Sequence, residues 1–344
     1  MHRLITFTLL SALVSLSCFA QETEEPSLSY SFFGVGQENS SYSETLKNFG
    51  GQAFKSQFDT SGLMQTSGGF TQVDPEWGFE IITNSTLLPK ESKETWDFTG
   101  FGVVQTDNTS LSQNALTING VYFPFKDGQK IQFGMRYQNI AFSRFNFKGT
   151  DQIDALNDAL LANDTEYNRL LNIVNSFVAD TNNDPDNGIP DTDNANALIV
   201  DEDGRLITSA AELKAARGLD PETQQGVIFE DASSIAFTAG YGYDSYFESQ
   251  EPGLRWRAGM QIGLPIYLSV LNTNNNITLT ETLPSGFDAS LYVGAGYQFS
   301  KEIGVIAMLD YVHAQRDKIQ AGNVYLPTNE FTSTNVTTQV YWAF

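Results

Sequence analysis

Acidic side chains are the most frequent groups in this chain that could perform chemistry, and they are densest near its middle. One stretch there carries oxygen-bearing side chains at its positions 1, 3, 5, 7 and 12, namely Asp180, Asn182, Asp184, Asp186 and Asp191. This spacing lets a loop wrap several oxygen ligands around a hard cation, and Ca²⁺ tolerates such irregular cages. Pro185 departs from the pattern, because a calcium loop usually has Gly there. The stretch is a candidate calcium site; the alternative is a solvated, disordered acidic linker.

Residues for enzymatic chemistry are scarce. Apart from His2, the chain has one histidine, His313, and its one cysteine is Cys18. Asp310 lies three positions before His313, so on a strand the two side chains point to opposite faces. A hydrolase needs its base held by a partner. We therefore expect His313 to be an interfacial residue, and we expect no enzymatic activity.

A second group of charged residues lies on the polar faces of predicted strands, where side chains would line a lumen. Its members are Arg136, Asp244, Glu248, Arg255 and Arg257. A tight turn is predicted over residues 250–253, so Glu248 and Arg255 should be nearly opposed across it. Such a pair would close or constrict a barrel, and the same residues could select its solutes.

Alternating apolar and polar residues predict the strands that position these groups. The clearest run covers residues 254–264, and similar runs cover 77–82, 115–125, 131–138, 235–244, 287–299 and 303–311. Weaker strands are expected at 28–32 and 63–73, with a loop over 37–60 and bulges near Gly120 and Pro265. The count is ten strands, or twelve if strands near Trp96 and over 42–58 are included. Trp96 could equally lie in a structured loop.

The C-terminal segment indicates what kind of sheet these strands form. Val336, Val340, Trp342 and Phe344 share one strand face. The pattern resembles the C-terminal signature of Gram-negative outer-membrane β-barrel proteins. The resemblance implies an antiparallel transmembrane β-barrel, inserted by the barrel assembly machinery through this strand. Outer-membrane lipid and lipopolysaccharide would then be its surroundings.

Aromatic residues support a membrane topology. Those beside predicted tight turns or the C-terminus are Trp77, Phe123, Phe125, Phe247, Trp256, Phe299 and Trp342. If the tight turns share one side, these side chains should form a girdle at that membrane interface. An even strand number with both termini in the periplasm then places the long loops outside the cell.

The N-terminus predicts export. Residues 1–20 combine Arg3, an apolar core over 4–16 and small residues near Cys18 and Ala20, which is typical of a signal peptide. The mature chain would start at Gln21 without a cysteine, and therefore without a disulfide or thiolate metal site. The chain's net charge of −22 disfavours nucleic acid as a partner. We expect localisation in the outer membrane.

One long insertion divides the predicted barrel. Residues 21–149 and 233–344 form its two halves, and residues 150–232 form an acidic extracellular insertion or cap. The insertion holds 18 of the 41 acidic residues of the chain. Apolar residues at helical spacing over 153–177 predict helices, and Ser209 with Glu212 matches a capping box.

The function expected from these features is passive transport through a porin-like pore or small-solute channel, with an unknown solute. One alternative is a non-conducting surface-binding or structural barrel that displays the acidic insertion. Another is a hydrophobic-solute transporter, because residues 133–149 resemble a strand of the long-chain fatty-acid transporter family. The chain lacks that family's N-terminal plug. No cofactor is required, and Ca²⁺ is the one ion that the sequence suggests.

Overall fold

The structure is a computed structural model that describes residues 28–49, 52–125, 127–162, 164, 167–172, 174, 205, 207, 209–216, 227–273, 277–321 and 324–344. The predicted signal peptide, the mature start at Gln21 and the candidate calcium stretch at 180–191 lie outside these residues. The division of the chain at 149 and 232 remains a prediction.

The described chain is dominated by antiparallel strands. They are β1 (Ser29–Phe49), β2 (Gln52–Gln72), β3 (Trp77–Pro89), β4 (Glu91–Phe98), β5 (Gly102–Tyr122), β6 (Gln129–Gly149), β7 (Ile228–Asp244), β8 (Gly253–Asn272), β9 (Ile277–Thr282), β10 (Gly286–Gln298), β11 (Ile303–Arg316), β12 (Ile319–Ala321), β13 (Val324–Leu326) and β14 (Thr328–Ala343). The described residues between β6 and β7 include α2 (Ile153–Ala162) and α4 (Ala210–Ala216), and residues 167–172 and 174 are also helical. None of the helices in the described part of the chain is long and apolar enough to cross a membrane.

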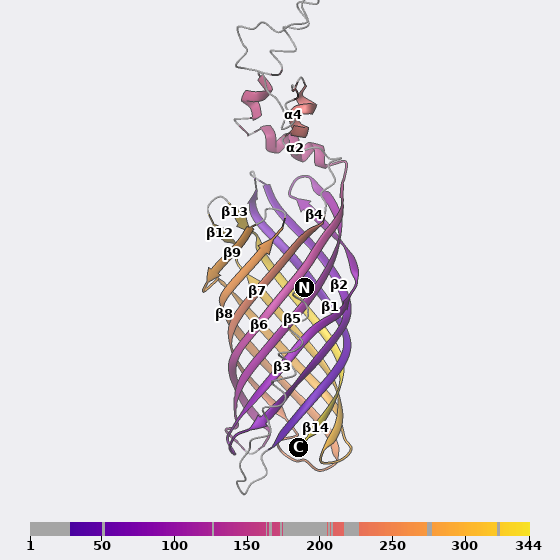
Figure 1. Cartoon of the computed structure of the whole chain (residues 1–344), viewed down its shortest axis with the longest axis vertical. Coiled ribbons are helices and arrows are strands. Elements are labelled where there is room, and N and C mark those ends of the chain that lie inside the picture. The colour runs from indigo at the N-terminus through magenta and orange to yellow at the C-terminus, as the bar shows by residue number, and fades with distance from the viewer. Residues whose placement is uncertain are drawn as a thin grey trace, which may run out of the picture.

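Twelve of the strands form one closed sheet (Figure 1). β3 and β4 follow one another between β2 and β5, and β9 and β10 follow one another beside β8. The twelve strands therefore occupy ten positions around the wall. β1 pairs with both β2 and β14, which closes the barrel. The predicted antiparallel barrel is confirmed. We call the end that carries Phe344 the lower end and the end that carries α2 and α4 the upper end, as in Figure 1.

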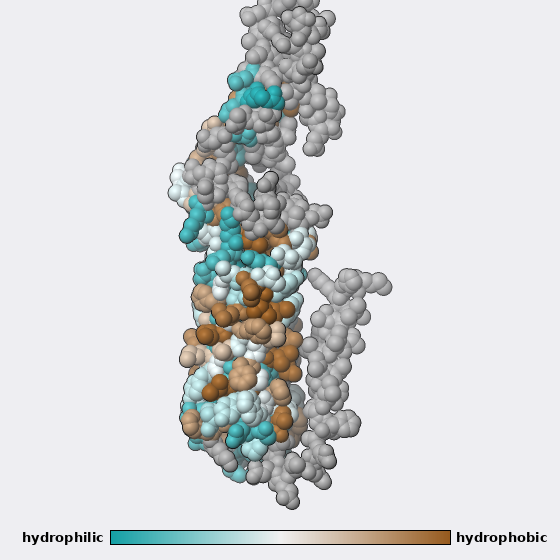
Figure 2. Space-filling model, turned by 90° about the vertical axis from the view of Figure 1, so that its left-hand side faces the viewer, coloured by the Kyte–Doolittle hydropathy of each residue, from teal (hydrophilic) through white to brown (hydrophobic). Residues whose placement is uncertain are grey.

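The outer face of the lower wall carries an apolar belt. Its members include Phe33, Val35, Phe79, Ile118, Phe133, Met135, Phe237, Met260, Ile262, Leu264, Leu291, Val293, Leu309, Val336 and Val340, all exposed. Figure 2 shows hydrophobic side chains gathered on the lower wall, with more polar surface above them. Exposed apolar side chains at this density are expected where a barrel wall meets lipid.

The aromatic girdle at the lower end is smaller than the sequence predicts. Trp77, Phe125, Trp256, Phe299 and Trp342 are exposed, with fractions between 41 and 61%. By contrast, Phe123 and Phe247 pack inside the barrel. The turns that carry these two residues fold into the lumen, so their rings are removed from the membrane interface.

The wall is taller than the sequence predicts. The loop expected over 37–60 is wrong, and Trp96, for which a strand and a structured loop were both open, lies in β4. Residues 37–49 and 52–60 belong to the upper halves of β1 and β2, and the region from 88 to 112 contains the end of β3, all of β4 and part of β5. On these upper segments the apolar side chains, such as Tyr42 and Phe58, point into the lumen while polar ones face out. The apolar face of these strands thus points outward in the belt and inward above it. A sequence pattern that requires outward apolar residues therefore misses the upper segments and assigns them to loops.

Of the two predicted bulges, one is present. The β7–β8 register shifts between Ile235 and Ala236, opposite Pro265, as predicted. The pairing around Gly120 is regular, so the bulge predicted there is wrong. Val121 is apolar and fully buried in the lumen, and this reversal of polarity explains the apparent slip in phase.

The described part of the insertion confirms its partly helical character. α2 rises directly from β6, and its Leu156 packs against Leu46, Phe54, Phe98 and Val104 at the upper end of the barrel. α4 begins where the Glu212 backbone N–H donates to Ser209 Oγ at 3.1 Å, which is the predicted helix cap. A separate apolar cluster of Leu161, Tyr167, Val174, Ile207 and Leu213 joins the helical segments.

Candidate functional site

The lower end of the lumen is filled by aromatic side chains. We call this cluster the aromatic plug: Tyr30, Phe32, Phe70, Val121, Phe123, Tyr246, Ile306, Met308 and Tyr341, with Phe247 packed against it. Tyr30 on β1 meets Tyr246 edge to face at 5.3 Å between ring centroids. Tyr246 lies in the turn after β7, five wall positions away from β1. The contact therefore joins opposite sides of the barrel.

A layer of charged side chains also fills the lumen. Glu80 on β3 is fully buried and accepts hydrogen bonds from Lys130 Nζ at 3.0 Å and Arg257 Nη2 at 3.3 Å. Arg257 on β8 also lies 3.7 Å, through Nε, from Asp244 Oδ2. Because β3 and β8 are four wall positions apart, the Glu80–Arg257 pair spans the lumen. Burying such charges is tolerable only when each finds its partner.

Four of the five predicted lumen residues lie in this lower half of the lumen, and the exception is Glu248, which is exposed. Asp244 and Arg257 meet as described, and Arg136 donates to Thr117 Oγ1 and Ser290 Oγ at 3.3 Å each. The remaining two, Arg255 and Glu248, do not form the predicted ion pair.

The predicted Glu248–Arg255 pair is wrong because a compact turn begins directly after β7, so Glu248 is not aligned opposite Arg255. The chain turns at 245–248, directly after Asp244, so Asp244 pairs in register with Arg257. Glu248 is exposed in that turn and accepts a hydrogen bond from Tyr243. Arg255 instead donates to Gln298 Oε1 at 2.6 Å.

The space left between these side chains is small. Two cavities of about 20 and 70 Å³ lie beside Arg257 in the lower lumen. Water molecules fit such volumes, whereas a solute of several heavy atoms does not.

A second apolar layer crosses the barrel above the belt. It consists of Tyr42, Phe58, Leu111, Ile140, Phe142 and Phe331, and we call it the upper apolar layer. Tyr42 on β1 lies 5.0 Å from Phe142 on β6, between ring centroids. These strands are four wall positions apart, so this contact also spans the lumen.

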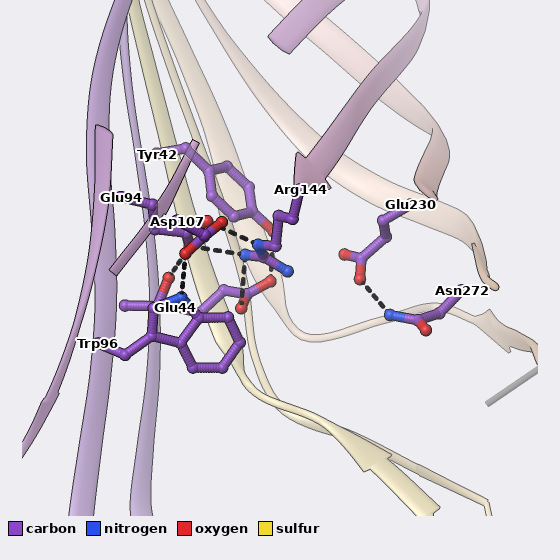
Figure 3. A network of polar contacts seen from close by, with 9 residues as sticks. Tyr42, Glu44, Glu94, Trp96, Asp107, Arg144, Glu230 and Asn272 are labelled. Atoms are coloured by element: carbon purple, nitrogen blue, oxygen red, sulfur yellow. Dashed lines mark hydrogen bonds and ion pairs between the residues drawn. The ribbon is translucent and has the colours of Figure 1, made fainter. Parts of the chain in front are cut away.

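Directly above the upper apolar layer lies a cluster that the sequence did not suggest (Figure 3). We call it the Arg144 cluster: Glu44, Glu94, Asp107, Arg144 and Glu230, all buried. Arg144 donates through Nε and Nη2 to the two oxygens of Glu94, at 2.7 and 2.9 Å, and through Nη2 to Glu44 at 3.1 Å. The bidentate geometry with Glu94 is the strong form of this pair. Five strands supply the cluster, so it braces the upper wall.

Neutral side chains complete the cluster. Trp96 Nε1 donates to Asp107 Oδ1 at 2.7 Å, and the Arg144 guanidinium lies 5.2 Å from the Trp96 ring centroid. Asn272 Nδ2 donates to Glu230 Oε2 at 2.7 Å, and Ser56 donates to Glu94. Each of the four carboxyl groups thus has at least one polar partner.

The cluster holds four carboxyl groups and one guanidinium, so its titration is unusual. Burial, reinforced by the neighbouring Glu94, raises the pKa of Asp107 to about 7. Burial and Glu44 likewise raise the pKa of Glu230 to about 7. Burial alone would lower the pKa of Arg144, but Glu44 and Glu94 outweigh it and raise that pKa. Asp107 and Glu230 therefore exchange protons near neutral pH.

These residues were missed because the segment of Glu44 was assigned to a loop, and the segment of Glu94 was left open between a strand and a structured loop. Glu44 lies between Tyr42 and Leu46, and Glu94 is followed on the same inward face by Trp96 and Phe98. The alternation of residue types could have revealed these buried acids, because one acidic residue among apolar residues on the same strand face indicates a buried charge.

His313 lies outside the lumen. It faces outward above the belt, with Nδ1 3.6 Å from Glu330 Oε1 and its ring tilted against that of Phe287 at 5.0 Å between centroids. Its position agrees with the predicted interfacial residue. Within the described residues, no group of three or more histidine, cysteine or acidic side chains could hold a metal ion.

Comparison with known proteins shows which solved structures have a similar fold. No family model matches the chain, and no curated protein matches it. The outer-membrane protease OmpT of Escherichia coli is similar in structure, with a TM-score of 0.53 and 8% identity over 94% of this chain and 99% of that one. The translocator domain of the autotransporter NalP of Neisseria meningitidis gives a TM-score of 0.31 at 9% identity, covering 98% of this chain and 94% of that one. The likeness to OmpT concerns the fold alone: the chain is an antiparallel β-barrel of the outer-membrane kind.

Proposed function

We propose that the protein is a non-conducting outer-membrane barrel that holds its upper end, with the acidic insertion, at the cell surface. The observation that carries this proposal is the filled lumen. At several heights a side chain contacts another from four or five wall positions away: Tyr30 with Tyr246, Glu80 with Arg257, Tyr42 with Phe142, and Glu44 with Arg144. A barrel filled in this way serves as an anchor and a scaffold.

A passive pore receives less support from the same contacts. Arg136, Asp244, Arg255 and Arg257 face the lumen, as selectivity residues would. However, they are bonded to other wall residues, and Asp244, Arg255 and Arg257 lie beside the tyrosines of the aromatic plug. Hydrophobic-solute transport gains no support from the two cavities described in the lower lumen, because the larger, about 70 Å³, is lined by Glu80, Gln132, Arg136 and Arg257 among others.

The apolar belt supports the membrane part of the proposal. It surrounds the lower wall, whereas the upper halves of β1, β2 and β14 carry polar residues outside. Such a wall would project beyond the lipid on one side only. The upper end, with Leu156 of α2 seated on its mouth, would then be the part that meets other molecules.

Single-cysteine labelling tests this orientation. Cys18 is the only native cysteine and lies in the predicted signal peptide, so an introduced cysteine gives a clean signal. Intact cells with Asp151→Cys at the upper end should react with a membrane-impermeant maleimide, whereas Glu76→Cys in the lower turn should react only after permeabilisation. Labelling of Glu76→Cys but not Asp151→Cys in intact cells would show that the orientation is opposite to the one proposed. Labelling of neither variant would show that the protein is not exposed at the cell surface.

A further inference from the structure

A polar groove lies on the outer face of the wall, above the apolar belt. It crosses four strands that pair side by side in the order β14, β1, β2 and β4. Two adjoining hollows of about 420 and 440 Å³ form it, and both are lined by Ser41, Asp59 and Thr332. This face is separate from the lumen, so the groove is independent of whether the barrel conducts.

The height of the groove follows from the strand register. Gln37 pairs with Leu63 on β2 and with Val336 on β14, and both of these apolar side chains are exposed in the belt. Asn39, two residues further up β1, pairs with Ser61 and Thr334, which line the groove. Two residues of a tilted strand rise by roughly 5 Å along the barrel axis. The groove therefore begins where lipid tails end and headgroups start.

A rigid corner forms one side of the groove. The β2–β3 register shifts between Leu63 and Met64, and β3 ends at Pro89. The Lys90 backbone is then held to β2, because its N–H donates to Ser61 O at 2.9 Å and its carbonyl accepts from Thr60 Oγ1 at 2.8 Å. Leu88, just before the corner, is 65% exposed. The corner thus places an apolar side chain at the top of the belt and a lysine directly above it.

The groove concentrates free cations in a strongly acidic protein. Lys55, Lys90 and Lys93 line it, and none of them forms an ion pair with another residue in the described ranges. Hydroxyl groups of serine and threonine supply much of the remaining lining, and Asp59, Glu91 and Glu330 supply carboxylates. Ammonium groups bind phosphate oxygens, while hydroxyls and carboxylates bind sugar hydroxyls.

From this chemistry and this height, we propose that the groove binds the phosphorylated sugar headgroup of a glycolipid in the outer leaflet. The lysines would bind the phosphate groups, and the hydroxyl-lined floor would bind the sugars. The acyl chains would continue down the apolar belt beside Leu63 and Val336. The choice of leaflet rests on the orientation proposed above, whereas the binding chemistry does not.

Binding can be measured on the full chain in detergent micelles, where leaflet and orientation play no part. The probe is rough-type lipopolysaccharide, titrated while the thermal stability of the folded barrel is followed. The wild type should be stabilised at saturating probe, and Lys90→Ala/Lys93→Ala should weaken binding at least tenfold. Lys90→Arg/Lys93→Arg should retain most of it. The matched control Lys148→Ala/Lys301→Ala, which removes two exposed lysines outside the groove, should bind like the wild type.

Three further probes identify the ligand. Enzymatically dephosphorylated lipopolysaccharide should lose the same tenfold as the alanine variant. Inorganic phosphate and phosphatidylglycerol micelles should stabilise the wild type much less than the glycolipid does. Equal binding by the wild type and the alanine variant would overturn the proposed site, and equal stabilisation by phosphatidylglycerol or inorganic phosphate would overturn the sugar-headgroup assignment. The cysteine labelling tests the orientation separately.

Discussion

Glu80 is fully enclosed in the lumen, and its two cationic partners come from other strands. Removing one member of such a group leaves the others charged and buried, which costs far more than the group contributes as a whole. Glu80→Ala should therefore lower the free energy of unfolding by about 3–5 kcal/mol, as measured by urea unfolding in detergent. Glu80→Leu/Lys130→Met, which removes one charge of each sign, should recover most of that loss.

A surface pair provides the comparison for this prediction. Lys301 and Glu251 form an ion pair of 3.0 Å with both side chains largely exposed. Lys301→Ala should change the free energy of unfolding by less than about 1 kcal/mol. If Glu80→Ala were no more damaging than Lys301→Ala, the Glu80 layer would not be a structural element of the lumen.

Asp107 and Glu230 predict how stability depends on pH. The pKa of each is about 7 in the folded protein, against ordinary values of 3.8 and 4.5. As the pH rises, the unfolded chain therefore loses the protons of Asp107 and Glu230 at a lower pH than the folded protein does. Their stabilising contribution is complete below about pH 4 and is lost as the pH rises to about 7. The free energy of unfolding should be larger at pH 5 than at pH 8.

Neutral variants test the assignment of that pH dependence. Asp107→Asn/Glu230→Gln should flatten the profile between pH 5 and pH 8, and it should exceed wild-type stability at pH 8 by on the order of 1 kcal/mol. Glu302→Gln, an exposed site at the lower end, should keep the wild-type profile. Parallel profiles for the wild type and the cluster variant would show that other groups titrate.

Sequence patterns located charged residues on the lumen side but not their partners. Alternation suffices to place Asp244, Arg255 and Arg257 on an inward face. The partner depends on where β7 ends, and a compact turn after Asp244 shifts the pairing from Glu248 and Arg255 to Asp244 and Arg257. Side-chain types do not encode that turn strongly enough to fix it in advance.

At the scale of elements, strand length was the main error. β1 and β2 are 21 residues long each, about twice what a membrane crossing requires. Their upper halves follow the rule for a soluble sheet, with apolar side chains inward. Their lower halves place Phe33, Val35 and Leu63 outward, as the rule for a lipid-facing wall requires. A search of the whole chain for strands with an outward apolar face therefore finds the lower segments but assigns the upper ones to loops.

The packing of α2 against the upper end of the barrel can be tested by mutation. Leu156 is 4% exposed and packs against residues of β1, β2, β4 and β5. Leu156→Ala should cost about 2–3 kcal/mol of docking free energy, because the vacated space cannot close completely. Hydrogen exchange should accelerate in α2 while amides of the barrel strands keep their protection.

Ala155→Ser, on the exposed side of the same helix, is the control and should leave exchange in α2 unchanged. Faster exchange throughout the barrel in Leu156→Ala would mean that the helix belongs to the folding unit of the wall. Unchanged exchange in α2 would mean that Leu156 does not hold it.

At the scale of the whole molecule, the closed barrel was predictable and its filled lumen was not. The alternating segments, the tight turns and the last strand together require an antiparallel barrel with an even number of positions. Filling depends on which inward side chains meet across the lumen, and such contacts join strands four or five positions apart. Tyr30 and Tyr246 illustrate this, because 216 positions separate them in the sequence while their rings pack together.

The closed lumen is the central claim, and single-channel recording tests it most directly. The refolded full chain would be reconstituted in a planar bilayer, with an open-lumen porin in the same bilayers as the positive control. The filled interior predicts no discrete current steps above the empty-bilayer background at any insertion density. Reproducible steps that scale with salt concentration and change in an Arg257→Ala variant would contradict the account and restore the pore.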